Sequence, residues 1–251
     1  RITIFLNTDV THRLMKNPGI SAFFPVYNDE GTVELMVARL RKVLSELTKD
    51  YEIIIVDDCS PDKSGQIADR LAKKYRNIKV IHHKKNRGYG GALKSGFNAA
   101  TKDLIFYTDG DAQYDVSELK KLMKYIDDYD FVTGIKIKRS DKLYRVLVSR
   151  IYYETLKLFF GIKIRDISGD FRLFRKKVVK SLNLTSDSGT ICLEMVKKIQ
   201  NRRFKTKEVY VHHYPRTSGE SAYFSPIPII KTFAELIPLW WEVIIKDRML
   251  R

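Results

Sequence analysis

The chain has 251 residues, of which 44% are hydrophobic and 30% are charged. This length and composition suit an α/β domain with a real hydrophobic core and exclude an intrinsically disordered chain. The formal net charge of +16 indicates an anionic partner, and composition alone leaves nucleic acid, anionic lipid and phosphorylated substrates open.

Residues 1–18 show no clear pattern, and no role is assigned to them. From residue 20 onward, apolar runs typical of buried strands alternate with amphipathic runs typical of helices. Strands are expected at Ile20–Val26, Tyr51–Val56, Ile78–Ile81, Leu104–Thr108 and Phe131–Thr133. Helices are expected between them at Thr32–Leu47, Ser64–Tyr75, Gly91–Ala100 and Val116–Tyr125. This rhythm predicts a mostly parallel, Rossmann-like sheet flanked by helices, and such sheets bind ligands at the carboxyl ends of their strands.

The second half of the chain is less regular. The expected elements are a helix at Lys142–Phe160, a strand at Phe171–Phe174, a helix at Ser188–Ile199, an extended segment at Lys207–His213 and a loop at Pro215–Ser221. We therefore expect one α/β domain over residues 19–222 and a separate C-terminal segment over residues 223–251. Lysine, glutamate and proline interrupt the apolar run Ala222–Ile245, so it lacks the roughly 18 apolar residues of a membrane span. We expect this amphipathic segment to face a membrane, or to lead into membrane helices outside this chain.

Cysteine usage is sparse. Cys59 and Cys192 form no CxxC pair and no His/Cys cluster, so a disulfide framework and a zinc site are not expected and a reducing compartment is favoured. No signal peptide is expected, because the apolar run in residues 1–6 is too short for the apolar core of one.

Two carboxylates follow the expected strand Leu104–Thr108, in the run Asp109-Gly110-Asp111-Ala112-Gln113. Two acids separated by one glycine can converge on a hard cation, and Mg²⁺ or Mn²⁺ favours such oxygen ligands while leaving places for phosphate oxygens. On its own, the motif is explained as well by a polar turn, because Asp-Gly pairs are common in turns.

Two further acids, Asp57 and Asp58, end the apolar run of the second strand. Acidic residues at this position can accept hydrogen bonds from the ribose or base of a nucleotide. We favour that function for Asp57, because adjacent acids at the end of a buried strand are costly without a partner. For Asp62 we favour capping of the next helix.

Two more loops follow strands. After the first strand, Tyr27 can face a base, while Asn28 or Asp29 can equally cap the next helix. In the run Asn86–Lys94, glycines such as Gly88 allow the backbone to approach a ligand closely, and the N-terminus of a helix favours anions. A plain glycine turn explains this run equally well, since it is neither a P-loop nor a GxGxxG motif.

Basic residues crowd the second half of the chain. Arginine can bind phosphate oxygens with two hydrogen bonds, although many of these charges belong to a solvated surface. The densest group comprises Lys136, Lys138, Arg139, Lys142, Arg145 and Arg150, and Arg216 lies in the loop after Pro215.

Taken together, these motifs resemble those of family 2 glycosyltransferases with the GT-A fold, and within that family the dolichyl- or polyprenyl-phosphate sugar synthases of the dolichol-phosphate mannose synthase type. The resemblance covers about residues 20–224 and rests on PVYNDE, VDDCSPD, NRGYGGAL, DGDAQ, DISGDFRLFR and HHYPRTSGES. Each motif is weak alone. Their order and spacing are specific, and they favour a cation site over a polar turn at DGDAQ.

The resemblance implies roles for particular residues. The nucleotide site is formed by Pro25, Tyr27, Asp29, Asp57 and Gly88. The Mg²⁺ or Mn²⁺ ligands are Asp111 and Gln113, with Asp109 beside both metal and sugar. The acceptor phosphate meets Lys136, Arg145 and Ser149. Arg216 closes over the phosphates and joins Asp109 and Asp111 as the catalytic set.

Three positions depart from the pattern of that family. Asp170 stands where glycine is usual, Tyr210 where proline is common, and Lys136 where arginine is common. These departures affect the acceptor side more than the donor side, because lysine cannot make the forked contact of arginine.

The expected reaction is an inverting transfer of a sugar from a nucleotide diphosphate, of the GDP-mannose or UDP-glucose type, to a polyprenyl or dolichyl phosphate. It is expected at the cytoplasmic face of a membrane, with the chain peripheral or anchored by segments outside it, and without nucleic acid as a partner. A phosphate acceptor needs no strong general base, which fits the absence of an obvious histidine candidate, since His212 and His213 are expected to be structural. A glycan or protein hydroxyl as acceptor needs a base, for instance Glu194. A basic nucleic-acid-binding module is the remote alternative, because acids at three strand ends would repel phosphates.

Overall fold

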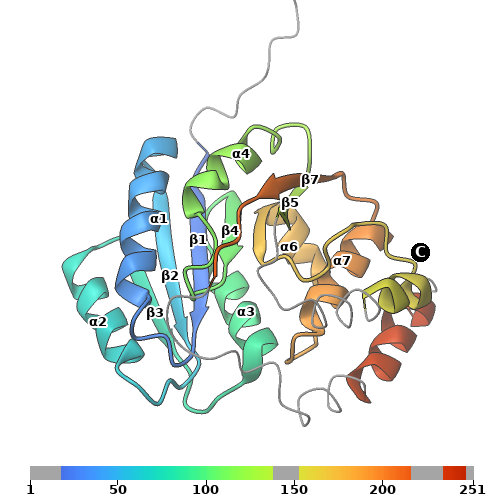
Figure 1. Cartoon of the computed structure of the whole chain (residues 1–251), viewed down its shortest axis with the longest axis horizontal. Coiled ribbons are helices and arrows are strands. Elements are labelled where there is room, and N and C mark those ends of the chain that lie inside the picture. The colour runs from blue at the N-terminus through green and yellow to red at the C-terminus, as the bar shows by residue number, and fades with distance from the viewer. Residues whose placement is uncertain (1–17, 138–152, 216–233, 247–251) are drawn as a thin grey trace, which may run out of the picture.

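A computed structural model describes residues 18–137, 153–215 and 234–246 of the chain. In these residues a 7-stranded sheet has the order β3-β2-β1-β4-β6-β5-β7 (Figure 1). The strands are β1 (Ile20–Val26), β2 (Tyr51–Asp57), β3 (Ile78–His82), β4 (Leu104–Thr108), β5 (Phe131–Lys136), β6 (Phe171–Arg175) and β7 (Thr206–Val211). The helices are α1 (Val33–Leu47), α2 (Ser64–Lys74), α3 (Gly88–Ala99), η1 (Val116–Glu118), α4 (Leu119–Met123), α6 (Lys176–Leu182), α7 (Ile191–Asn201) and η3 (Trp241–Lys246). Further helical residues are 153–160 and 234–240.

The sheet is mostly parallel, as expected from the sequence. Its antiparallel pairs are the two that β6 makes, with β4 on one side and β5 on the other. From β1 the chain runs outward through β2 to β3 and then returns to β4, on the opposite side of β1. The strand order therefore reverses between β1 and β4, which is where open α/β sheets bind ligands.

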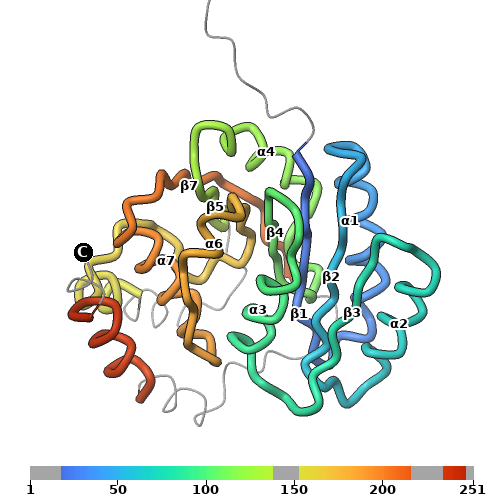
Figure 2. Tube along the Cα trace, turned by 180° about the vertical axis from the view of Figure 1, so that it is seen from behind, coloured from blue at the N-terminus to red at the C-terminus, as the bar shows by residue number. Residues whose placement is uncertain are grey.

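Helices cover both faces of the sheet (Figures 1 and 2). On one face, α1, α2 and α4 bury residues such as Met36, Leu71 and Leu119. On the other face, α3, α6 and α7 bury residues such as Leu93 and Val178. The strands between them are apolar on both sides, which explains their continuous hydrophobic runs.

The C-terminal helical segment lies beside helix 153–160 and α7 in both views. Leu239 and Val243 are buried in a small separate core against these two helices. Ile237 and Trp241 are exposed. One side of the segment is thus occupied by the domain itself, and its contact with a membrane stays a prediction. None of the helices in the described ranges is long and apolar enough to cross a bilayer.

Local sequence patterns misplace a few element boundaries. Helix α3 begins at Gly88 rather than Gly91, because Gly88 N donates to Asn86 Oδ1 at 3.0 Å and Gly90 N donates to Asp187 O at 2.9 Å. The single helix expected at Val116–Tyr125 is divided into η1 and α4, and α6 was not expected. Of the helix expected at Lys142–Phe160, only residues 153–160 belong to the described part of the chain.

Candidate active site

The turn after β4 packs against the end of β1, at the point where the strand order reverses. Gly110 lies between Asp109 and Asp111, and a Cβ atom at Gly110 would stand 2.5 Å from the carbonyl oxygen of Pro25. A side chain at this position would therefore push the turn away from β1. Thr32 Oγ1 donates to the Gly110 carbonyl oxygen at 2.7 Å, which ties the start of α1 to the same turn.

Asp109 has the most perturbed carboxylate of this turn. Tyr89 Oη donates a hydrogen bond to its Oδ1 at 2.9 Å. Burial raises the pKa of Asp109 well above its ordinary value, and the charges of Asp170 and Asp111 raise it further, against the opposing effects of Lys136 and the Tyr89 hydrogen bond. An ionised Asp109 is therefore costly unless a positive charge approaches it.

Asp170 belongs to this site, although the sequence marks it only as a departure from the family pattern. Continuing the antiparallel register of β4 and β6 by one residue places it opposite Asp109. Its Oδ1 lies 3.3 Å from both Tyr107 Oη and Cys192 Sγ. Like charges directly opposite each other destabilise a sheet, so this pair favours a bound cation, a proton or a polar ligand.

A buried cation lies next to this acid pair. Arg172 of β6 has no exposed surface, and its Nε has no hydrogen-bond partner among the described residues. Burial alone lowers the pKa of a guanidinium, but the neighbouring Tyr107, Cys192 and Asp170 raise the pKa of Arg172 above its ordinary value. Its permanent charge offsets part of the negative charge of Asp170.

Asp111 and Gln113 lie where the chain returns after β7. Asp111 is buried, and Gln113 N donates to its Oδ1 at 3.1 Å. Gln113 Nε2 donates to Tyr214 O at 2.8 Å, and Tyr214 N donates to Gln113 O at 2.8 Å. The segment before Arg216 therefore runs beside the DGDAQ motif, while Arg216 itself lies outside the described residues.

The acids at the end of β2 have histidine partners from β3. His82 Nδ1 lies 2.8 Å from Asp57 Oδ2, and His83 Nδ1 lies 2.6 Å from Asp58 Oδ1. The other oxygen of Asp57 accepts from Ser60 N at 3.0 Å. The two buried acids thus have the partners that their position requires, and sequence reasoning missed both histidines because they come from a different strand.

The other residues predicted to bind the nucleotide lie at the same edge of the sheet. Tyr27 is about half exposed, and its backbone N lies 3.3 Å from Asp29 Oδ2. The carbonyl oxygen of Asp29 accepts from Thr32 N at 2.9 Å, so Asp29 also helps to start α1. At Gly88 another part of the chain, and not a ligand, comes close to the backbone: a Cβ atom there would stand 2.6 Å from Asp187 O. Contact of these residues with a nucleotide stays a prediction.

On the predicted acceptor side, the structure describes Lys136 at the end of β5. Its Nζ lies 3.5 Å from Ser168 O, and its charge acts on Asp109. Arg145 and Ser149 lie outside the described residues.

Glu194 is poorly suited to act as a general base. It is fully buried and accepts hydrogen bonds from Ser186 N at 2.9 Å and from Lys198 Nζ at 2.6 Å. Burial would raise the pKa of Glu194, but these contacts outweigh it and leave the pKa lowered. His212 pairs with Glu118 at 2.6 Å, consistent with its expected structural role.

The donor set fits a divalent cation of the magnesium type. In the described ranges, no group of three His, Cys, Asp or Glu side chains is arranged to hold a metal ion. Mg²⁺, however, is often bound by one or two carboxylates together with waters and substrate phosphates. Asp109 and Asp111 supply two such carboxylates, and a cation would stabilise the ionised form of Asp109, whose pKa burial and the charges of Asp170 and Asp111 raise.

Comparison with known proteins identifies the family of the chain. The family model described as Glycosyl transferase family 2 matches residues 21–182. An undecaprenyl-phosphate 4-deoxy-4-formamido-L-arabinose transferase from Photorhabdus laumondii is 30% identical over 227 residues, which are 90% of this chain and 66% of that protein. The protein of the same description from Yersinia enterocolitica is 29% identical over 221 residues, or 87% of this chain and 66% of its own length. The chain thus spans just under two thirds of these relatives.

Solved structures share the fold. Glucosyl-3-phosphoglycerate synthase from Mycobacterium tuberculosis, in complex with Mn²⁺, UDP-glucose and phosphoglyceric acid, aligns with a TM-score of 0.68 at 16% identity, over 89% of this chain and 80% of that chain. A mannosyltransferase from Pyrobaculum calidifontis, in complex with GDP-mannose and Mn²⁺, aligns with a TM-score of 0.65 at 19% identity. The alignment covers 89% of this chain and 65% of that chain. At these identities the likeness shows the GT-A fold alone.

Proposed function

This chain belongs to glycosyl transferase family 2, and from that premise we propose that it transfers a sugar from a nucleotide diphosphate to a polyprenyl phosphate. The observation that carries the proposal is the turn Asp109–Asp111, held against the end of β1 at the reversal point of the sheet. Relatives described as undecaprenyl-phosphate sugar transferases support the choice of acceptor.

We propose that Asp109, Asp111 and Gln113 hold Mg²⁺ or Mn²⁺. When bound there, the cation supplies positive charge that stabilises the leaving diphosphate. The cation would favour the ionised form of Asp109, because its positive charge opposes the burial and the neighbouring acids that raise the pKa of Asp109. We propose that Arg216, two residues after Tyr214, adds a second positive charge.

The nucleoside would lie across the ends of β1 and β2. Tyr27 offers an exposed ring to the base. Among the described residues, Asp57 uses both oxygens in hydrogen bonds, whereas no partner of Asp58 Oδ2 is found. We therefore propose that Asp58, more than Asp57, accepts hydrogen bonds from the donor nucleoside. The proposed donor is of the GDP-mannose or UDP-glucose type, and binding of each nucleotide sugar distinguishes them.

The transfer itself would be a single in-line displacement with inversion at the anomeric carbon. An oxygen of the acceptor phosphate forms the new bond to that carbon while the bond to the nucleotide diphosphate breaks. A phosphate monoester is largely ionised near neutral pH, with a second pKa of about 6, so no base has to remove a proton. Lys136, Arg145 and Ser149 would hold the phosphate. The lipid acceptor places the reaction at a membrane surface, which we propose is the cytoplasmic face.

The test is transfer of labelled sugar from a nucleotide sugar into lipid extracted with organic solvent. Asp111→Ala should lower transfer by roughly 10²–10³-fold, as expected for loss of charge stabilisation at the leaving group. Circular dichroism should show that the variant is folded. Full activity of folded Asp111→Ala would contradict the metal assignment, and absence of label from the lipid with every donor would contradict the acceptor.

A hydroxyl acceptor is the second candidate, and Asp170 is the observation that favours it. Asp170 lies opposite Asp109 and is suitably placed to act as a general base. Asp170→Asn should leave kcat with a lipid phosphate within about tenfold, because that acceptor needs no base, but should lower transfer to a hydroxyl by roughly 10²–10⁴-fold. A large loss of kcat with the lipid phosphate would favour the hydroxyl-type mechanism.

A further inference from the structure

Two adjacent acids at the end of β2 meet two adjacent histidines at the end of β3. The pairs are Asp57 with His82 and Asp58 with His83, and the parallel register of the two strands sets Asp57 opposite His82. Both acids are nearly inaccessible to solvent. The pairs have the same chemistry, but their surroundings differ.

The pair Asp57–His82 lies against α2, and the His82 side chain is 43% exposed, whereas that of His83 is 5% exposed. Gly65, in the first turn of α2, lies so close that a Cβ atom would stand 2.6 Å from Asp57 Oδ2 and 3.3 Å from His82 Cε1. His82 Nε2 lies 2.9 Å from Asp69 Oδ1. The Asp69 contact is the largest cause that raises the pKa of His82, followed by Asp57, while burial opposes them. This pair joins β2, β3 and α2 and leaves little of Asp57 for a ligand.

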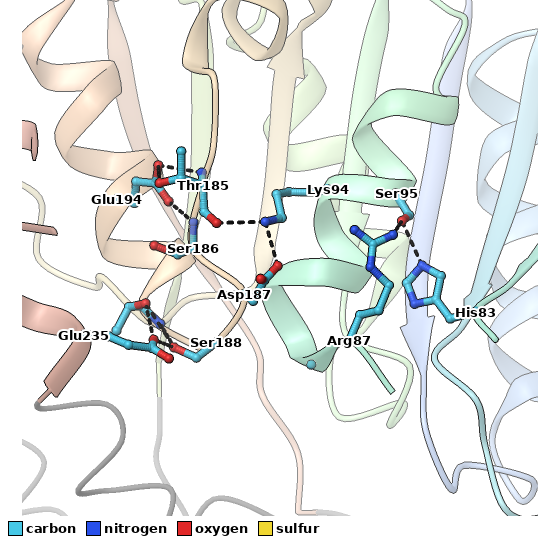
Figure 3. A network of polar contacts seen from close by, with 12 residues as sticks. His83, Arg87, Lys94, Ser95, Thr185, Ser186, Asp187, Ser188, Glu194 and Glu235 are labelled. Atoms are coloured by element: carbon cyan, nitrogen blue, oxygen red, sulfur yellow. Dashed lines mark hydrogen bonds and ion pairs between the residues drawn. The ribbon is translucent and has the colours of Figure 1, made fainter. Parts of the chain in front are cut away.

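The pair Asp58–His83 continues toward α3. His83 Nε2 lies 2.8 Å from Ser95 Oγ, and Arg87 Nη1 donates to Ser95 Oγ at 3.3 Å (Figure 3). Arg87 N donates to Asp58 Oδ1 at 2.8 Å, so the loop before α3 is held by the same carboxylate. Oδ1 of Asp58 thus accepts two hydrogen bonds, and Oδ2 accepts none from the described residues.

These contacts are consistent with one direction of hydrogen bonding. The guanidinium of Arg87 donates to Ser95, the Ser95 hydroxyl donates to His83 Nε2, and His83 Nδ1–H donates to Asp58. In this direction Nδ1 carries a proton and Nε2 accepts a hydrogen bond. The order of groups is that of a serine hydrolase, but a guanidinium next to the hydroxyl disfavours the imidazolium that such catalysis needs.

We propose that His83 is a positioning residue for the donor nucleotide. By holding Oδ1 of Asp58, it directs Oδ2 toward the N–H or O–H groups of the nucleoside. A carboxylate oxygen accepts such donors and repels phosphate, so the partner is the ribose or base and not the diphosphate. This inference rests on the proposed function, because it requires that a nucleotide binds at this edge of the sheet.

The experiment compares His83→Asn with His83→Gln in the full chain. The asparagine amide can take the place of Nδ1 and still donate to Asp58, whereas the longer glutamine amide takes the place of Nε2 and reaches Ser95 instead. Calorimetry with UDP and with GDP, each with Mn²⁺, should give a dissociation constant within about threefold of the unaltered chain for His83→Asn and about tenfold weaker for His83→Gln, the loss of one hydrogen bond to a charged group. With a nucleotide sugar, His83→Gln should raise KM while kcat changes little.

His82→Gln is the matched comparison, since it alters the neighbouring pair by the same substitution. It should change nucleotide affinity less than His83→Gln does. Equal affinities of both His83 variants and the unaltered chain would overturn the inference, and so would a larger loss in His82→Gln. If His83→Gln does not fold, nucleotide affinity is measured instead for His83→Asn and Asp58→Asn. Asp58→Asn should then show the whole loss of affinity, about tenfold. Failure of the unaltered chain to bind any nucleotide would instead overturn the proposed function.

Discussion

A carboxylate in an unfavourable setting distinguishes Asp109 from the other acids of the described residues. Its pKa is raised by burial and then by Asp170 and Asp111, and no described residue forms an ion pair with it. A protein keeps such a group when function requires it, because stability and activity trade against each other at sites of this kind. The metal-free chain should therefore be less stable to unfolding than it would be without the carboxylate of Asp109.

Asp109→Asn should stabilise the protein at neutral pH in the presence of EDTA. Because the pKa of Asp109 is raised in the folded state, folding holds a proton that the unfolded chain releases above about pH 3.9, and stability falls as the pH rises toward the folded value. Asparagine has no proton to lose. Thermal unfolding from pH 4 to pH 8 should give a variant with the higher Tm at pH 8, by roughly 2–4 °C for each kcal/mol gained, and with no advantage near pH 4.

Tyr89 provides the check on this interpretation. Its hydroxyl donates to Asp109 Oδ1 and can also donate to an asparagine oxygen, so the substitution keeps that contact. A difference in Tm that does not vary with pH would mean that packing, and not the buried charge, separates the two proteins.

At the scale of single elements, α3 can pack closely against the sheet because Gly96 has no side chain. A Cβ atom at Gly96 would stand 2.2 Å from Phe23 Cδ2, and Phe23 is fully buried in β1. Phe23 cannot move away easily, because its ring packs edge-on against Phe97 at 4.9 Å and stacks on Tyr107 at 5.5 Å. The N-terminal end of the same helix carries the loop that meets Asp58.

Gly96→Ala should destabilise the protein by about 1–3 kcal/mol, the usual cost of overpacking a core. In a helix alanine is otherwise preferred to glycine by up to about 1 kcal/mol, so a net loss can come only from the contact with Phe23. Urea unfolding measures the difference. Asn98→Ala, at an exposed position of the same helix, should be neutral or slightly stabilising, and destabilisation by both variants would point to a general defect in α3.

Local sequence patterns predict the elements from β1 to β5 well, because each strand is an apolar run and each helix has one apolar face. The pattern of α6 is harder to recognise, since KKVVKSL has only 7 residues, carries three lysines and directly follows β6. Its helix depends on Val178 and Leu182, which are buried against the sheet by tertiary packing.

Local sequence patterns likewise identify some residues of the candidate site and miss others. Asp57, Asp109 and Asp111 could be singled out, because each lies at or within three residues of the carboxyl end of a buried strand, and such ends bind ligands. Asp170 and His83 could not be assigned to the site, because their neighbours are set by strand order and register between distant segments, which no local pattern records. Position relative to another strand, and not residue type, gives these two side chains their roles.

At the scale of the whole molecule, we predict that the chain, with its net charge of +16, meets a membrane through an exposed apolar surface. Leu158 and Phe159 are 82% and 66% exposed at the end of helix 153–160, and Ile237 and Trp241 are 77% and 61% exposed on the C-terminal helices. The two elements are joined, since Trp240 Nε1 donates to Phe159 O at 3.0 Å and their inner sides share one core. We call these four exposed side chains the outer apolar set.

Replacing two members of the outer apolar set by serine, in Ile237→Ser with Trp241→Ser, should weaken binding to vesicles that contain anionic lipid. Burial of one large apolar side chain is worth about 1.5–3 kcal/mol, so the double variant should lower the partition coefficient by at least about tenfold. Cosedimentation with the vesicles measures it, and calorimetry with nucleotide shows whether the site is intact.

Leu35→Ser, at an exposed apolar position on α1, is the matched control and should bind vesicles as the unaltered chain does. Raising the salt concentration should weaken all of these proteins alike, because it screens the shared positive charge and not the apolar contact. Equal losses in the control and in the double variant would mean that charge alone attracts the protein to the membrane, and that the outer apolar set has another partner.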